Sequence, residues 1–150
     1  MSVTLKQFLA DGRLKRHRSS PREIRDLLRV ADRDLKDAAV TAISLDRRFI
    51  TAYQAVLQLA TIVLAASGFR ATGAGHHWVT FKTLPELLGQ ALQNLSDYFD
   101  QCRTKRNLSD YDRAGEISRE EAGELLKEAK KFRPAVLGWL KKHHPTFLPK

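Results

Sequence analysis

A stretch without charged residues runs from Phe49 to Phe69, and it limits the possible folds more than any other segment. Its length would nominally span a bilayer. Five polar residues interrupt it, namely Thr51, Gln54, Gln58, Thr61 and Ser67. Gln54 and Gln58 share one face of a helix because they are four residues apart. We therefore interpret residues 45–67 as the buried central helix of a bundle, stopped by Gly68, and we expect no contact with a membrane.

Three further helix starts are marked by capping boxes, in which serine or threonine precedes glutamate by three residues. They are Ser20 with Glu23, Thr83 with Glu86, and Ser118 with Glu121. Pro21 suits the first helical position after Ser20. Apolar residues at helical spacing follow each box, and the first of these stripes continues to about Ile43.

Two helix breaks are expected within these segments. Ser96 is expected to cap a fresh helix start after a bend near residues 94–96, and Pro134 is expected to kink or split the last helix. No strand-like alternation and no internal repeat appears in the sequence. The prediction is an all-α protein. It has one domain over residues 1–150, folded as an up-and-down bundle of about five helices, with a basic N-terminal arm over residues 1–19.

Residues 69–82 are expected to form a loop between two helices. The segment Gly73-Ala-Gly75 lacks the Lys-Ser/Thr ending and the preceding strand of a phosphate-binding loop. His76 and His77 are adjacent, so on regular structure their side chains point apart and do not chelate one metal ion as a pair. We expect no metal and no other cofactor.

The net charge of +9 and the isoelectric point near 10.0 favour a polyanionic partner such as RNA, DNA or an acidic protein. Part of this charge lies in the arm, which contains Arg13, Lys15, Arg16, His17 and Arg18. Two interpretations of the arm stay open, a solvated surface segment and an arm that contacts RNA or phosphate.

The single cysteine, Cys102, excludes an intramolecular disulfide framework and a cysteine-rich zinc site. Its place on a helical stripe indicates a small buried residue. The first nine residues are interrupted by Lys6 and Gln7 and do not form an apolar signal segment. We therefore expect a protein of the reducing cytoplasm.

Residues 103–112 are the candidate functional segment. Leu95, Phe99 and Cys102 mark the apolar face of the helix that precedes it, and one more step of four residues leads to Arg106. A permanent charge at the end of an apolar face must be paired, solvated or presented to a ligand. Asn107 follows directly, and its amide can orient a hydroxyl or a phosphate oxygen.

Arg106 and Asn107 late in a helix, with Tyr111 five positions after the arginine, resemble the Arg-(four to six residues)-His signature of HEPN domains. These are prokaryotic helical-bundle proteins, and many are endoribonuclease toxins paired with a nucleotidyltransferase. Three other segments also resemble this group, so the likeness covers most of the chain: Gly12-Arg-Leu, Arg48-Phe-Ile-Thr-Ala-Tyr-Gln-Ala55 and Gly75-His-His77. The sequence departs from the signature at Tyr111, which stands where the family has its catalytic histidine.

The resemblance implies a homodimer in which two motif helices meet, and a metal-independent attack of the ribose 2′-hydroxyl on the phosphate. Arg106 suits the developing charge because its planar guanidinium binds phosphate bidentately. Tyr111, with a reference pKa near ~10, is a poor general base at neutral pH, so His76 or His77 would supply the imidazole. The candidate catalytic residues are Arg106, Asn107 and Tyr111. The candidate phosphate-binding residues are Arg103, Lys105, Arg106, His76 and His77.

Three functions are compatible with these features. The first is a HEPN-like module that binds RNA or nucleotide, or that partners a nucleotidyltransferase, in a toxin–antitoxin or defence system. In that setting Tyr98 and Tyr111 are candidate hydroxyls for nucleotidyl modification. The second is a metal-independent endoribonuclease toxin. The third is a structural adaptor, in which Arg106 pairs with Asp110, Asp112 or an acidic residue of another helix.

Overall fold

The computed structural model describes the backbone of residues 3–111 and 116–148 and the side chains of residues 4–107 and 116–148. It confirms the predicted all-α class. The long helices are α2 (Pro21–Ala38), α3 (Leu45–Ala66), α6 (Gln93–Tyr111) and α7 (Arg119–His143). Shorter elements complete the described chain: α1 (Val3–Ala10), α4 (His76–Lys82), α5 (Leu84–Leu88), the 3-10 helices η1 (Gln90–Leu92) and η2 (Pro145–Phe147), and the strands β1 (Leu14–Arg16) and β2 (Phe69–Ala71).

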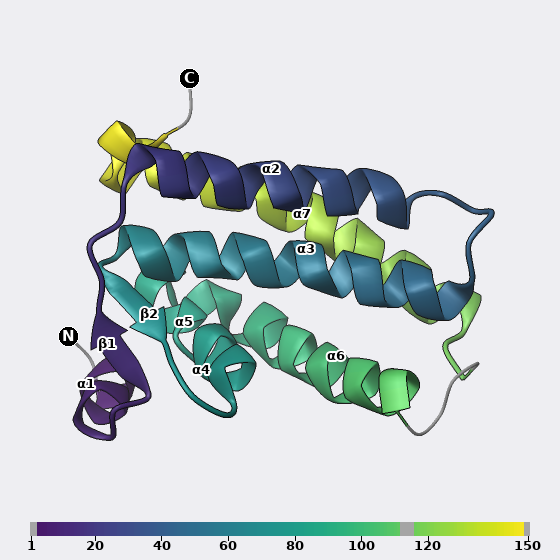
Figure 1. Ribbon diagram of the computed structural model, residues 1–150, viewed down its shortest axis with the longest axis horizontal. Helices are drawn as coiled ribbons and strands as arrows, with labels where there is room; N and C mark the ends of the chain where they lie inside the picture. Colours follow the sequence, from purple (N-terminus) through teal and green to yellow (C-terminus); the bar gives the residue numbers. More distant parts are fainter. Residues whose placement is uncertain (1–2, 112–115, 149–150) are drawn as a thin grey trace.

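Helix α3 is the central element, as predicted. It contacts α2, α4, α5, α6 and α7, and Figure 1 shows it running between α2 and α6. It is long and apolar enough to cross a membrane by length and composition, but 72% of its most apolar window is buried inside the protein. Its buried residues include Phe49, Tyr53 and Ile62, which form the main core together with Leu125 and Phe132 of α7.

Residues near the end of the predicted arm pair with the start of the predicted loop in a small sheet. The arm and the loop therefore both contain regular structure, which corrects both predictions. Strand β1 pairs with β2 in antiparallel register, with Leu14 opposite Ala71 (Figure 1). A second, smaller core forms beneath it from Leu5, Phe8, Leu14, Leu64, Phe69 and Val79. Residues 3–16 are therefore folded against the bundle. A three-residue strand has too few positions to show an alternating pattern, and its pairing partner lies more than fifty residues away.

The capping boxes have different outcomes. At Ser118 the box is complete, because Ser118 Oγ accepts from the Glu121 amide and Glu121 Oε1 accepts from the Ser118 amide, both at 3.0 Å. At Ser20 only half is present. Ser20 Oγ accepts from the Glu23 amide at 3.1 Å, whereas the Glu23 carboxylate is bound by His17 and Ser19.

The predicted box at Thr83 is wrong. Thr83 Oγ1 donates to the Thr80 carbonyl, and Glu86 accepts from the backbone amide of Leu5, because α4 leads almost directly into α5 and leaves no open helix start at this point.

The predicted fresh helix start at Ser96 is also wrong. The chain breaks at Gly89, whose φ of 122° suits a residue without Cβ, and α6 then begins at Gln93. Ser96 lies inside α6, where its buried hydroxyl donates to the Phe81 carbonyl at 2.6 Å. Pro134 lies within α7, which continues to His143, so Pro134 does not split the last helix in two. Helix α2 ends at Ala38, which leaves Val40 and Ile43 exposed in the connection to α3.

Candidate functional site

The apolar stripe of α6 fixes the position of the candidate segment. Phe99 is fully buried between Phe81 and Phe132, with ring centroids 5.9 and 5.1 Å away, and Cys102 is buried one turn later. This confirms the predicted core face and the interpretation of Cys102 as a buried residue. Burial raises the pKa of the Cys102 thiol to about 12, so the thiol stays protonated at neutral pH. The stripe therefore anchors α6 and holds Arg106 at the edge of the core.

Arg106 lies against the buried ring of Tyr53. Its guanidinium carbon is 5.8 Å from the ring centroid, a distance at which the face of the ring attracts a cation. Arg106 Nη1 also donates to Asn107 Oδ1 at 3.2 Å. Tyr53 has no exposed surface, so the arginine is held on a rigid support.

The Tyr53 hydroxyl connects this support to α4. It lies 2.9 Å from Nδ1 of His77. Burial raises the pKa of Tyr53, so the hydroxyl keeps its proton. Burial lowers the pKa of His77 to about 4, with His76, Arg106 and Arg103 adding to the effect, so the imidazole is neutral at pH 7. In the Nε2–H tautomer Tyr53 donates to Nδ1, and this leaves Nε2–H as a donor for another group.

A cavity of about 190 Å³ opens between α4 and α6. It is lined by Gly75, His76, His77, Arg103 and Asn107. Arg103 donates from Nε to Asp100 Oδ1 at 2.7 Å, which fixes its side chain along α6. His76 Nδ1 lies 3.2 Å from the Gly73 carbonyl. The cavity thus presents one guanidinium, one amide and two imidazoles, a set of donors suited to an anionic oxygen.

The structure brings five of the predicted residues to this region and separates one from them. Arg103, Asn107, His76 and His77 share the cavity, and Arg106 lies beside it against Tyr53. Lys105 is on another face of α6, where it forms an ion pair with Glu121 and lines a cavity of about 330 Å³ together with Tyr98 and Cys102. Residues 103 and 105 are two positions apart and therefore lie on different faces of a helix, so the separation of Lys105 from Arg103 could have been predicted from the sequence.

The side chain of Tyr111 lies outside the described side chains, and so do Asp110 and Asp112, the proposed partners of Arg106. The backbone of α6 continues to Tyr111. Tyr98, the other candidate hydroxyl, is half-buried on the Lys105 side of the helix, where burial and the neighbouring Cys102 raise its pKa.

Two residues of the site are not among the predicted site residues. Tyr53 is buried in the core, and no local pattern identifies its partner because His77 lies 24 residues away. Asp100 orients Arg103 from one turn earlier, and this spacing of three residues was visible in the sequence.

The expectation that the two histidine side chains point apart is wrong. They are the first two residues of α4, and their ring centroids lie 4.4 Å apart in an edge-to-face arrangement. Each Nδ1 already has a partner, the Gly73 carbonyl for His76 and the Tyr53 hydroxyl for His77. Within residues 3–111 and 116–148, no group of three or more histidine, cysteine or acidic side chains is placed to hold a metal ion.

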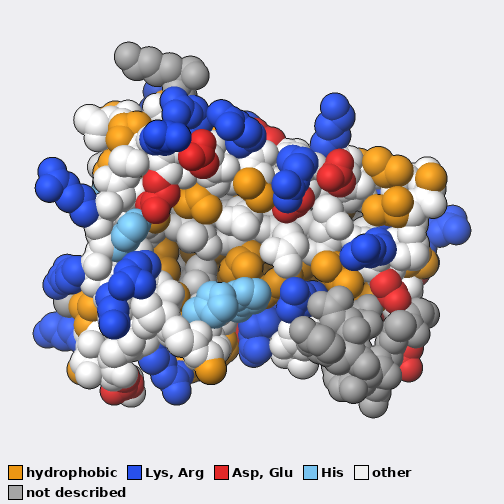
Figure 2. Space-filling model, viewed as in Figure 1, with side chains coloured by type: hydrophobic (Ala, Val, Ile, Leu, Met, Phe, Trp, Pro, Cys, Tyr) orange, Lys and Arg blue, Asp and Glu red, His pale blue; other side chains and the backbone are white. Residues whose placement is uncertain are grey.

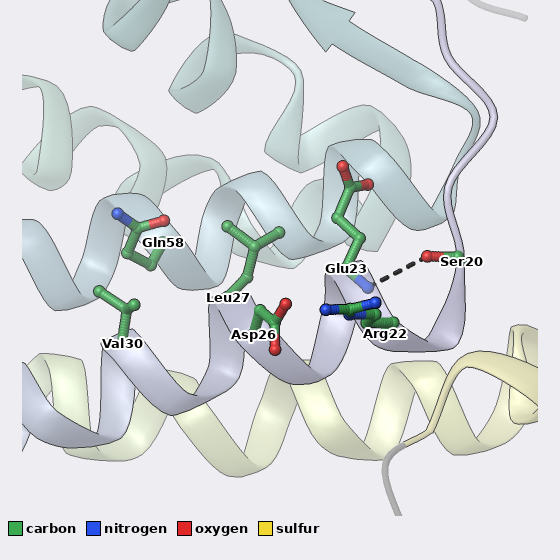
Figure 3. A pocket seen from close by; sticks show the side chains of 7 residues that line it. All are labelled: Ser20, Arg22, Glu23, Asp26, Leu27, Val30 and Gln58. Carbon is green, nitrogen blue, oxygen red and sulfur yellow. Dashed lines mark hydrogen bonds between the residues drawn. The ribbon is translucent and has the colours of Figure 1, made fainter.

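The face that carries the histidines has side chains of both charges. Figure 2 shows histidine side chains beside arginines and lysines, with acidic side chains among them, on the side of the molecule where α2, α3 and α4 are visible. An open hollow between α2 and α3 on this side is lined by Ser20, Arg22, Glu23, Asp26, Leu27, Val30 and Gln58 (Figure 3). Its charges are mixed, and none of the predicted site residues lies in it.

No protein family, no curated protein and no solved structure matches this chain in the comparisons with known proteins.

Proposed function

We propose that this chain is a HEPN-like helical module that binds the phosphate groups of RNA or of a nucleotide. The observation that carries the proposal is the cavity in which Arg103 and Asn107 of α6 meet His76 and His77 of α4. Its donors belong to a chain with a net charge of +9, which attracts polyanions from a distance. The resemblance in residues 106–111 points to the same class of ligand.

The chemistry of the cavity suits a phosphate group. A guanidinium with Nε held by a carboxylate still presents Nη1 and Nη2, and two parallel N–H groups match two phosphate oxygens. Arg103 is placed in this way by Asp100. The Asn107 amide and the Nε2–H of neutral His77 add donors that carry no charge. Arg106, over the Tyr53 ring, contributes a second positive charge beside the cavity.

The module also implies a partner. The resemblance favours a homodimer or a complex with a nucleotidyltransferase, in a toxin–antitoxin or defence system. Binding takes precedence over catalysis because Tyr111 replaces the histidine of the signature, and the loss of a base with a pKa near neutrality costs on the order of 10²–10⁴-fold in rate.

A second candidate function is a metal-independent endoribonuclease, and the position of His77 favours it. His77 brings an imidazole to the same cavity as Asn107 from another helix. In the Nδ1–H tautomer, Nδ1–H donates to the Tyr53 hydroxyl oxygen and Nε2 is free to accept a proton from a ribose hydroxyl. A pKa of about 4 makes this imidazole a weak base until a bound anion raises that value. Cleavage of single-stranded RNA in EDTA by the wild type, lost in Arg106→Ala, would support this function. Equal cleavage by both proteins would reveal a contaminating nuclease.

The binding function is tested by two variants that each remove one positive charge from α6. Arg103→Gln changes the cavity, whereas Lys105→Gln changes the opposite face, and each residue has a carboxylate partner. We expect Arg103→Gln to weaken the binding of single-stranded RNA about tenfold, the effect of losing one charge-assisted hydrogen-bonding group. Lys105→Gln should bind almost as the wild type does. Equal losses in the two variants would indicate attraction by overall charge and contradict a site in this cavity.

A further inference from the structure

A second cavity adjoins the candidate phosphate site. It measures about 230 Å³ and lies between α2, α3, β2 and α4. Its apolar walls are formed by Leu27, Leu64, Ala65, Phe69 and Ala71. Its polar lining residues are His17, Glu23, Thr61, Arg70, His76 and Thr80. A cavity with apolar walls and a few polar groups at its edge is typical of a site for a small, flat and mostly apolar group.

Glu23 gives this cavity a specific hydrogen-bonding edge. Its Oε1 lies 2.7 Å from Nε2 of His17 and accepts from Ser19 Oγ at 2.6 Å. Burial alone would raise the pKa of Glu23, but the hydrogen bonds from Ser19 and His17 outweigh burial and keep the pKa below its usual value. The carboxylate is therefore ionised at neutral pH. Both bonds end on Oε1, so the lone pairs of Oε2 are the acceptors that a ligand would meet.

The orientation of Glu23 supports this role. Figure 3 shows Glu23 and Leu27 extending from α2 towards α3, whereas Arg22 and Asp26 stay over α2. Glu23 and Leu27 thus line the second cavity as well as the open hollow, and Asp26 lines only the hollow.

His76 joins the second cavity to the first. It contributes to the walls of both, so the two cavities meet at this one residue. Separately they are smaller than the ~300–1,000 Å³ of usual small-molecule sites, and together they fall within that range. One cavity offers donors for a phosphate group, and the other offers apolar walls with a carboxylate. A nucleotide has the matching parts in the same molecule.

We infer that the second cavity is a base-binding subsite that selects guanine, in a nucleotide or RNA whose phosphate lies against Arg103 and Asn107. The guanine edge presents two adjacent donors, N1–H and N2–H₂, and the two lone pairs of Glu23 Oε2 can accept both. Adenine and cytosine each place a ring-nitrogen acceptor beside their amino group, which a carboxylate repels. The ring of His76, at the boundary, offers a face for stacking. This inference rests on the proposed phosphate site.

The test compares guanosine monophosphate, adenosine monophosphate and ribose 5-phosphate in NMR titrations of the full chain. We expect guanosine monophosphate to bind roughly tenfold more tightly than adenosine monophosphate. Glu23→Gln should abolish this preference. Asp26→Asn is the matched control, because it removes the same charge from the same helix outside the subsite, and it should keep the preference. Thr61→Phe, which fills the second cavity from α3, should weaken both nucleotides and leave ribose 5-phosphate unaffected.

The possible outcomes separate the subsite from the phosphate site. Equal binding of the two nucleotides, or a guanine preference that survives in Glu23→Gln, would overturn the subsite. If ribose 5-phosphate still bound to the wild type and not to Arg103→Gln in that case, the phosphate site would stand. If none of the three compounds bound, both proposals would fall.

Discussion

The hydroxyl of Tyr53, a residue with no exposed surface, lies 2.9 Å from Nδ1 of His77 at the rim of the candidate site. This contact couples the central helix to α4 and holds one wall of the cavity in place. The contact is compatible with both protonation states of His77. A neutral His77 accepts from the hydroxyl, whereas an imidazolium donates to the hydroxyl oxygen, so the pair stays hydrogen-bonded in either state.

The first prediction concerns this hydrogen bond. Tyr53→Phe keeps the ring beneath Arg106 but removes the partner of His77. We expect the free energy of unfolding in urea to fall by about 1 kcal/mol, the usual net value of one such bond. RNA affinity should fall as well, because His77 loses the contact that orients its ring. Tyr98→Phe, on the other face of α6, is the control, and RNA binding that is equal in the two variants would contradict the role of Tyr53.

The pH dependence of stability provides the second prediction. The pKa of His77 is about 4 in the folded protein and about 6.5 in the unfolded chain. Between these values the unfolded chain binds more protons, so the free energy of unfolding decreases as the pH falls from 6.5 to 4. His77→Asn should show a flatter dependence over this range in urea unfolding. Parallel curves for wild type and variant would show that His77 does not titrate in this way.

The third prediction links ligand binding to proton uptake. Burial, His76 and the positive charges of Arg106 and Arg103 disfavour the charged form of His77, and a bound phosphate would offset the arginine charges. Binding should therefore raise the pKa of His77 and strengthen as the pH falls towards 5. Calorimetric titration of RNA near pH 6, in two buffers of different ionisation enthalpy, would measure the protons taken up. His77→Asn should remove most of this uptake. Binding without any uptake in the wild type would contradict the linkage.

The fourth prediction concerns the core that supports α6. Phe99 has no exposed surface and packs against Phe81 and Phe132. Phe99→Ala should lower the free energy of unfolding by roughly 3–5 kcal/mol, because it leaves a cavity at the centre of the bundle. Thr104→Ala, an exposed change on the same helix, should stay within about 0.5 kcal/mol of the wild type. Urea unfolding measures both, and a small loss in Phe99→Ala would show that this contact does not anchor the helix.

Local patterns in the sequence were sufficient for the helical class and for several details. The uncharged run from Phe49 to Phe69 predicted the central helix, whose observed bounds, Leu45–Ala66, differ from the prediction by one residue. The capping box at Ser118 and the apolar stripe through Phe99 and Cys102 were predicted for the same reason. Each depends on residues within one or two helical turns, whose spacing is directly visible in the sequence.

The tertiary structure decided what depends on residues far apart in the chain. The pairing of β1 with β2, the contact between Tyr53 and His77, and the cavity shared by α4 and α6 connect segments separated by about 25 to 60 residues. At Thr83 the sequence contains the pattern of a capping box, but the box does not form. Helix α4 leads almost directly into α5, and the Thr83 hydroxyl donates to the Thr80 carbonyl. Sequence spacing determines which side chains share a face of one helix. Which faces of different helices meet is determined by how the whole chain buries its apolar surface.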